Sequence, residues 1–275
     1  MRTRNDAKRW ARTALGVVIV VVLLFPFYWM INASFQPGGA LLSSSPSWFP
    51  VDGTTDGYAK ALSSQGEHLL ASLVVALGTV VVSLLVALPA SYALAQLRFR
   101  GAQPVIFVLL IVQMIPGIVM ANALYEMFAN LGLIDSYLAL ILADSTATIP
   151  FAILVLRAFM VSIPRELTEA ARVDGAGHWR TFVSVILPIS RNATVTAGLF
   201  AFLFAWADFL FAVTLTTGRS FEPITVGIYR FIGNQSADWN AVLATAVLAS
   251  IPAAILLVIA QRYVVAGVTG GAIKE

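Results

Sequence analysis

The sequence predicts an all-α integral membrane protein with six transmembrane helices and both termini in the cytoplasm. Three observations lead to this fold class: the composition, the length of the apolar runs, and the distribution of basic residues. Hydrophobic residues make up 59% of the 275 residues and charged residues only 11%, with a mean hydropathy of +0.85. These values lie well outside the range of soluble proteins.

Six apolar runs are each long enough to cross a membrane, because about 20 residues span roughly 30 Å of hydrocarbon. Positive charges precede the first run, as they do in a signal peptide. However, the bulky residues Phe25–Trp29 stand where cleavage requires small ones, which favours a retained helix. The six expected spans are Thr13–Ile31, Leu69–Leu97, Gly101–Tyr125, Ser136–Leu156, Asn192–Thr217 and Asn240–Gln261.

The basic residues set the orientation of these spans. If the N-terminus is cytoplasmic, only Lys60, Arg219 and Arg230 of the 17 lysines and arginines lie outside. The positive-inside rule therefore places both termini in the cytoplasm. The expected order is a cytoplasmic N-terminus with the first helix (1–35), an extracytoplasmic loop (36–68), a five-helix core (69–265) containing a cytoplasmic loop (162–190), and a cytoplasmic tail (266–275).

The polar loop at 162–190 predicts two short amphipathic helices with a break between them. Pro164 suits the first turn of a helix, Gly175 can adopt the left-handed conformation that ends one, and Pro188 is expected to stop the second. Helices of about three turns are unstable alone in water, so we expect them to pack on the membrane domain, on a partner protein, or on both. Residues spaced i, i+3, i+4, i+7 share a face; they are Leu167, Ala170, Ala171 and Asp174, then Trp179, Phe182, Val183 and Ile186.

This loop resembles the EAA loop of the permease subunits of bacterial ABC importers. The resemblance implies the type I ABC importer permease fold, with the loop forming coupling helices that sit in a groove of a cytoplasmic ATPase. An ordinary loop with a glycine turn is the alternative. The positions that match the family run from Glu169 to Pro188, and the expected coupling residues are Glu169, Ala170, Ala171, Asp174, Gly175 and Ala176.

Further segments, from Pro89–Ala95 to the tail Gln261–Lys274, resemble the carbohydrate, maltose-permease-like subfamily, including mycobacterial trehalose importer permeases. The expected cargo is therefore a disaccharide, trehalose first; glycerol phosphate or another oligosaccharide is the alternative. Gln96 departs from the basic residue that the family often has. Three tail residues are expected to contact the ATPase, namely Gly271, Ala272 and Lys274.

The resemblance also implies partners in a bacterial plasma membrane. They are a second homologous permease, an ATPase homodimer that binds ATP and Mg²⁺, an extracytoplasmic sugar-binding lipoprotein, and surrounding lipid. This chain is expected to hold no cofactor or metal and to be no enzyme. None of its three lysines follows a glycine, as a phosphate-binding P-loop requires. Two histidines and no cysteine do not support a zinc site, and the scattered arginines do not indicate nucleic-acid binding.

An integral-membrane enzyme acting on a lipid-linked substrate is a rival hypothesis, but it would need catalytic groups clustered at one interface.

Polar residues inside the apolar runs are candidates for a translocation path. An ionised carboxylate facing lipid is costly, so acids in these runs should face the bundle interior or a wet cavity. Hydrogen bonding between helices is the alternative role for these residues. For Asp208, the alternative is packing at a subunit interface or at the outer gate. The candidates are Asp144, Thr148, Asn122 and Asp208.

Overall fold

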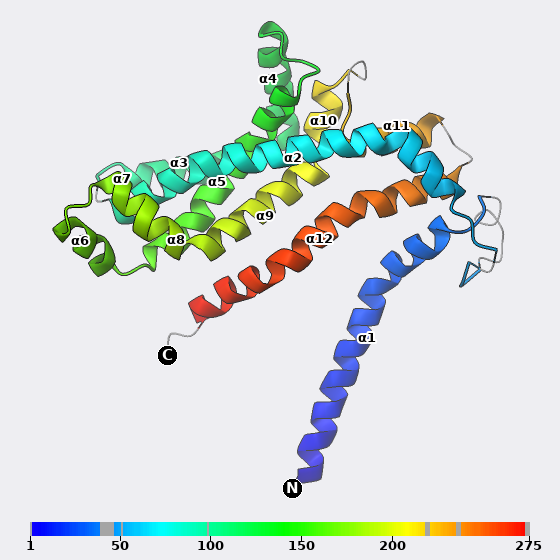
Figure 1. The fold of residues 1–275 in the computed structure, drawn as a ribbon, viewed down its shortest axis with the longest axis horizontal. Coiled ribbons are helices and arrows are strands. Elements are labelled where there is room, and N and C mark those ends of the chain that lie inside the picture. The colour runs from blue at the N-terminus through cyan, green and yellow to red at the C-terminus, as the bar shows by residue number, and fades with distance from the viewer. Residues whose placement is uncertain are drawn as a thin grey trace. The chain divides into compact units, whose positions relative to one another are not determined.

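Every regular element in the described part of the chain is a helix, as the sequence predicts. The computed structural model describes residues 2–38, 47–50, 52–97, 99–217, 221–234 and 238–272. The chain divides into two compact units: residues 1–66 with 228–250, and residues 67–227 with 251–275. Figure 1 gives the order of the helices, three of which contribute residues to both units: α2 (Asp56–Gln96), α11 (Ile224–Asn234) and α12 (Trp239–Ala272).

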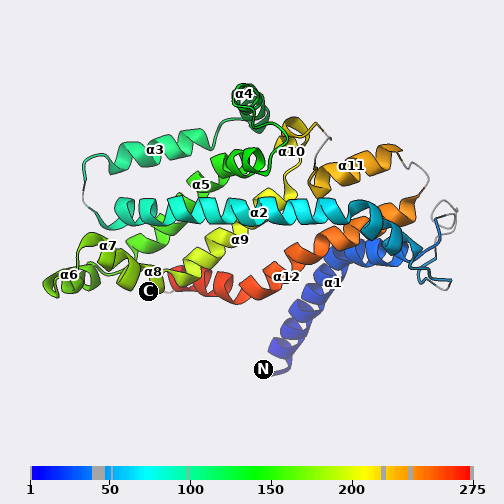
Figure 2. The same cartoon turned by 45° about the horizontal axis from the view of Figure 1, so that its top comes forward.

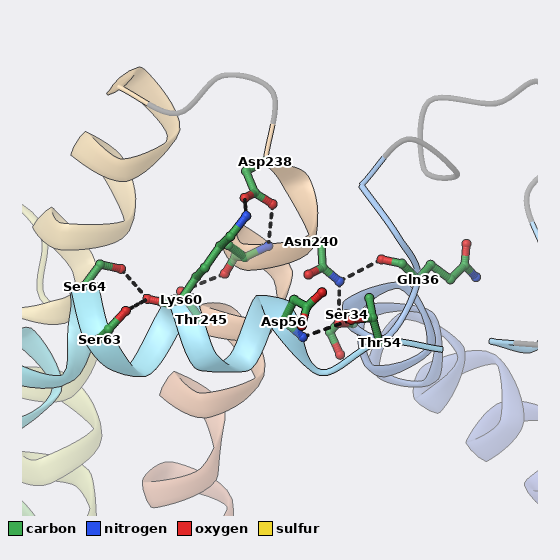
Figure 3. Close-up of polar contacts among 11 residues, drawn as sticks. Ser34, Gln36, Thr54, Asp56, Lys60, Ser63, Ser64, Asp238, Asn240 and Thr245 are labelled. Carbon is green, nitrogen blue, oxygen red and sulfur yellow. Dashed lines mark hydrogen bonds and ion pairs between the residues drawn. The ribbon is translucent and has the colours of Figure 1, made fainter. Parts of the chain in front are cut away.

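The first unit is held together by polar contacts between α1 (Arg2–Ser34) and the starts of α2 and α12. The buried Asn240 amide donates to the carbonyl oxygens of Ser34 (2.8 Å) and Gln36 (2.7 Å), and Figure 3 shows it between them. Gly57 lies so close that a Cβ there would stand 2.0 Å from Oδ1 of Asn240. These contacts fix the relative positions of three helix ends, far apart in the sequence.

An exposed ion pair in the same unit joins Lys60 of α2 to Asp238, with 2.6 Å between Nζ and Oδ2 (Figure 3). The Lys60 ammonium lowers the pKa of the Asp238 carboxyl below its usual range. A carboxyl with a depressed folded-state pKa stabilises the fold above its unfolded pKa, and that stability is lost as pH falls through the folded value. We expect a small loss of thermal stability of the detergent-purified protein between pH ~5 and ~3, because exposed pairs contribute little.

The Asp238→Asn variant tests this expectation, since its amide cannot titrate. Its melting temperature should change less with pH over that window than that of the wild type. An Asp52→Asn variant is the control, because Asp52 is exposed and carries the same change. Identical pH profiles for the wild type and Asp238→Asn would contradict the prediction.

The second unit contains the helices that build the core. The two central helices are α5 (Tyr137–Val161) and α9 (Arg191–Ala207), which Figures 1 and 2 show side by side. Ser136 caps α5, because its hydroxyl accepts from the amide of Ala139. One core cluster combines buried residues of α2, α5 and α9. A second cluster combines α2 and α5 with α4 (Gly117–Asn130) and α10 (Leu210–Leu215).

Among the described residues, four helices are individually long and apolar enough to cross a membrane, and there are up to six spans if two bent helix pairs each count as one. Two expected runs are interrupted. Gly101–Tyr125 divides into α3 (Ala102–Val112) and α4, which meet at 96°. Proline disfavours helical geometry at the residue before it, so Pro116 ends one helix and opens the next. The run Asn192–Thr217 divides into α9 and α10 at Asp208.

The structure also changes the start of one element. Helix α2 begins at Asp56 rather than at Leu69, so part of the expected loop 36–68 is helical. The residues of this first part of α2 are mostly polar, and hydropathy locates apolar spans rather than helix ends. The tail likewise continues α12 as a helix to Ala272.

Candidate functional site

The cytoplasmic loop expected at 162–190 begins with the short helix α6 (Arg165–Val173), and Pro164 precedes it. The helix ends in a Schellman turn: the Ala176 amide donates to the Ala171 carbonyl and the Gly175 amide to that of Arg172, both at 2.9 Å. Gly175 has φ +81°, which a residue with a Cβ adopts only with strain. The expected helix, glycine break and second helix are all present.

The second helical piece starts with α7 (His178–Thr181) and continues through a π-helical turn, Phe182–Ile186, into α8 (Leu187–Ile189). Pro188 lies inside α8, so the piece ends one residue later than expected, before a 79° bend into α9. Phe182 is buried in the core of the second unit, where its ring contacts that of Tyr92 with centroids 5.3 Å apart. This contact attaches the loop to α2.

The outer face of this segment is uncovered. Trp179 is 70% exposed and Val173 is 88% exposed, although both are large apolar residues. Among the expected coupling residues, Glu169, Ala170, Asp174 and Gly175 are exposed on α6 and the turn after it, and Ala171 and Ala176 are partly exposed. An exposed apolar patch rimmed by charged residues is typical of a protein interaction site.

A polar cavity of about 390 Å³ lies beside this surface. Its wall includes Glu169, Arg172, His178 and Gln96, and the Arg172 guanidinium donates to Nδ1 of His178 at 3.1 Å. The Gln96 amide donates to the Met160 carbonyl at the end of α5 (2.7 Å). The sequence marked Gln96 only as a departure from a basic residue. In the structure it joins the end of α2 to the end of α5, at the base of the loop.

A second cavity, of about 240 Å³, lies where both interrupted helices meet α5. Its polar side chains are Gln113 after α3, Thr146 of α5 and Asp208 between α9 and α10. The Asp208 carboxylate accepts from the amides of Phe211 (3.3 Å) and Ala212 (2.9 Å), so it caps the start of α10. The sequence did not single out Gln113, because only the helix breaks bring it to the same cavity as Thr146 and Asp208.

The remaining path candidates do not line that cavity. Asp144 is 1% exposed, and its carbonyl accepts from the Thr148 hydroxyl, which is 2.7 Å from the hydroxyl of Ser83 on α2. Asn122 is exposed on α4. In the tail, Gly271 and Ala272 end α12, and Lys274 lies outside the described residues.

Comparisons with known proteins agree with this architecture. The chain is 34% identical to the diacetylchitobiose uptake system permease protein DasC of Streptomyces coelicolor, over 94% of this chain and 95% of DasC. It is 32% identical to the trehalose transport system permease protein SugB of Mycobacterium tuberculosis, over 98% of each. A crystal structure of a bacterial ABC transporter involved in the import of the acidic polysaccharide alginate shares the fold, with a TM-score of 0.81, 22% identity and coverage of 94% and 97%. Residues 87–270 match the family model, and the chain belongs to the family of binding-protein-dependent transport system inner membrane components.

Proposed function

We propose that this chain is a transmembrane permease subunit of an ATP-driven sugar importer and forms half of its translocation pathway. The observation that carries the proposal is the exposed α6–α7 surface on a chain of this family. In a protein this apolar, a charged helix pair with an uncovered face is a place where a soluble partner can bind.

The proposed topology has six spans with both termini in the cytoplasm. The four long helices and the two bent helix pairs, α3 with α4 and His178–Ile189 with α9, support six, and the excess of basic residues on one side supports the orientation. In this topology the α6–α7 surface faces the cytoplasm. The protein would be a multi-pass component of the bacterial plasma membrane.

The proposed mechanism is alternating access driven from this surface. An ATPase homodimer binds ATP and Mg²⁺, and its closure moves α6 and α7 as a rigid body. Glu169 offers a charge-assisted contact to a basic residue or backbone N–H of the ATPase. Ala170 and Ala171 allow close approach, and Gly175 makes the turn. The contacts of Phe182 with Tyr92 and of Gln96 with Met160 then carry the motion to α2 and α5.

The proposed cargo is a sugar delivered by an extracytoplasmic binding protein, and a second homologous permease completes the pathway. Permeases of diacetylchitobiose and trehalose systems are similar to this chain along nearly its whole length. A disaccharide is therefore the expected cargo, with trehalose first. Another oligosaccharide or glycerol phosphate is the alternative.

Purification from native membranes after mild crosslinking tests the assembly. We expect one ATPase in two copies, one different permease and a sugar-binding lipoprotein to co-purify. The Glu169→Lys variant reverses the charge at the proposed contact, so it should insert normally but lose most of the ATPase. Glu126→Lys, an exposed change of the same kind on α4, should retain it. Recovery of the wild-type chain alone would overturn the proposal.

A further inference from the structure

The cavity at the two helix interruptions combines polar and aromatic groups. Gln113 is exposed, and its side-chain amide makes no hydrogen bond within the described part of the chain. The Thr146 hydroxyl donates to the Ala143 carbonyl (2.6 Å), which leaves its lone pairs free to accept. Phe204 and Phe211 contribute aromatic surface. Donors, acceptors and aromatic rings therefore line one small space.

This combination suits a polyhydroxylated ring. Hydroxyl groups both donate and accept, so they can satisfy an amide, a hydroxyl and a carboxylate together. The apolar C–H faces of a sugar ring can pack on the aromatic side chains. The volume of about 240 Å³ is below the roughly 300–1,000 Å³ of sites that bury drug-sized ligands, so it fits a single ring better than a chain of rings.

The charge of the wall disfavours anions. Among the described residues that line this cavity, Asp208 is the single charged one, and none is a lysine, arginine or histidine. The start of α10 could otherwise attract an anion, but the Asp208 carboxylate already accepts from the Phe211 and Ala212 amides. An anionic solute would find no cation to pair with, and its burial without one is costly.

We propose that this cavity is a binding subsite for one ring of a neutral sugar and that its Asp208 side discriminates against anionic solutes such as sugar phosphates and uronates. The inference rests on the proposed function, because it assumes that sugar passes this chain. It separates neutral sugars from glycerol phosphate among the possible cargoes.

Thiol labelling tests the subsite in the assembled importer. The chain has no cysteine, so Gln113→Cys introduces its single thiol. Labelling of this chain is followed with a cationic aminoethyl and an anionic sulfonatoethyl methanethiosulfonate of similar size. The quantity measured is the ratio of the labelling rate of the cationic reagent to that of the anionic one. We expect this ratio to exceed, by several-fold, the ratio for a small thiol in solution. Adding Asp208→Asn should bring the ratio back to the solution value.

Sugar protection gives the second readout. Saturating trehalose or another neutral disaccharide should slow labelling several-fold, whereas glucose 6-phosphate should not. Ser64→Cys, on the exposed start of α2, controls for nonspecific protection. If Gln113→Cys does not assemble, Thr146→Cys takes its place.

The outcomes separate this inference from the proposed function. Absence of labelling, a solution-like reagent ratio, or labelling unaffected by neutral sugar would overturn the subsite. If the complex still co-purifies with its ATPase and imports sugar, the proposed function stands without it. Failure of the wild-type chain to bind an ATPase would instead overturn the proposed function.

Discussion

Replacing Gly175 with proline is expected to abolish sugar uptake while the protein still inserts into the membrane. The residue needs φ +81°, whereas the proline ring fixes φ near −65°. Proline also lacks the N–H that donates to the Arg172 carbonyl, so the Schellman turn cannot form. Helix α6 would then lose its defined direction relative to α7. The measurement is uptake of radiolabelled sugar, normalised to the amount of membrane-inserted chain.

Gly177 provides the matched control. It lies two residues further on with φ −69°, and a Cβ there would meet open space, so Gly177→Ala should keep near-normal uptake. Gly175→Ala should fall between the two, because a left-handed residue with a Cβ costs about 1–2 kcal/mol. Normal uptake by Gly175→Pro would show that the geometry of this turn is not needed for transport.

Replacing Asn240 with leucine is expected to give the largest loss of stability in the first unit. Leucine is of similar size but cannot donate to the carbonyls of Ser34 and Gln36, both of which belong to buried residues. A buried acceptor left without a partner costs about 1–3 kcal/mol. Thermal unfolding of the detergent-purified protein should therefore shift down by several degrees.

Asn130→Leu is the matched control for this change. Asn130 is exposed at the end of α4, so the same substitution should leave the melting temperature nearly unchanged. A second route to the same contact is Gly57→Ala, whose Cβ would collide with Asn240. Equal melting temperatures for Asn240→Leu and Asn130→Leu would mean that these hydrogen bonds contribute no net stability.

The all-helical fold and the glycine break could be predicted because each depends on local properties. A long apolar run without charges has few structural options other than a helix. The pattern of Ala170, Ala171 and Asp174 followed by Gly175 indicates a helix and its end within a few residues. The family resemblance was likewise carried by a short contiguous segment, and the match over residues 87–270 confirms it.

The helix interruptions and the second cavity could not be predicted from hydropathy. The run containing Pro116 remains apolar through the bend, and Asp208 was treated as one acid within a continuous span. Asp208 ends α9 because its backbone is extended and its carboxylate caps the next helix. Gln113 and Thr146 are distant in the sequence, so their proximity depends on packing rather than on any repeat.

The π-helical turn at Phe182–Ile186 has a consequence for how this segment can change in evolution. Its hydrogen bonds span one more residue than those of an α-helix, and each residue of an α-helix corresponds to about 100° of rotation. Such a turn takes up one extra residue without rotating the helix that follows, so deleting one residue here would favour a regular α-helix and leave α8 facing as before relative to Trp179. A deletion elsewhere in the segment would instead rotate its later part by about 100°, so the π-helical turn is the place where its length can change.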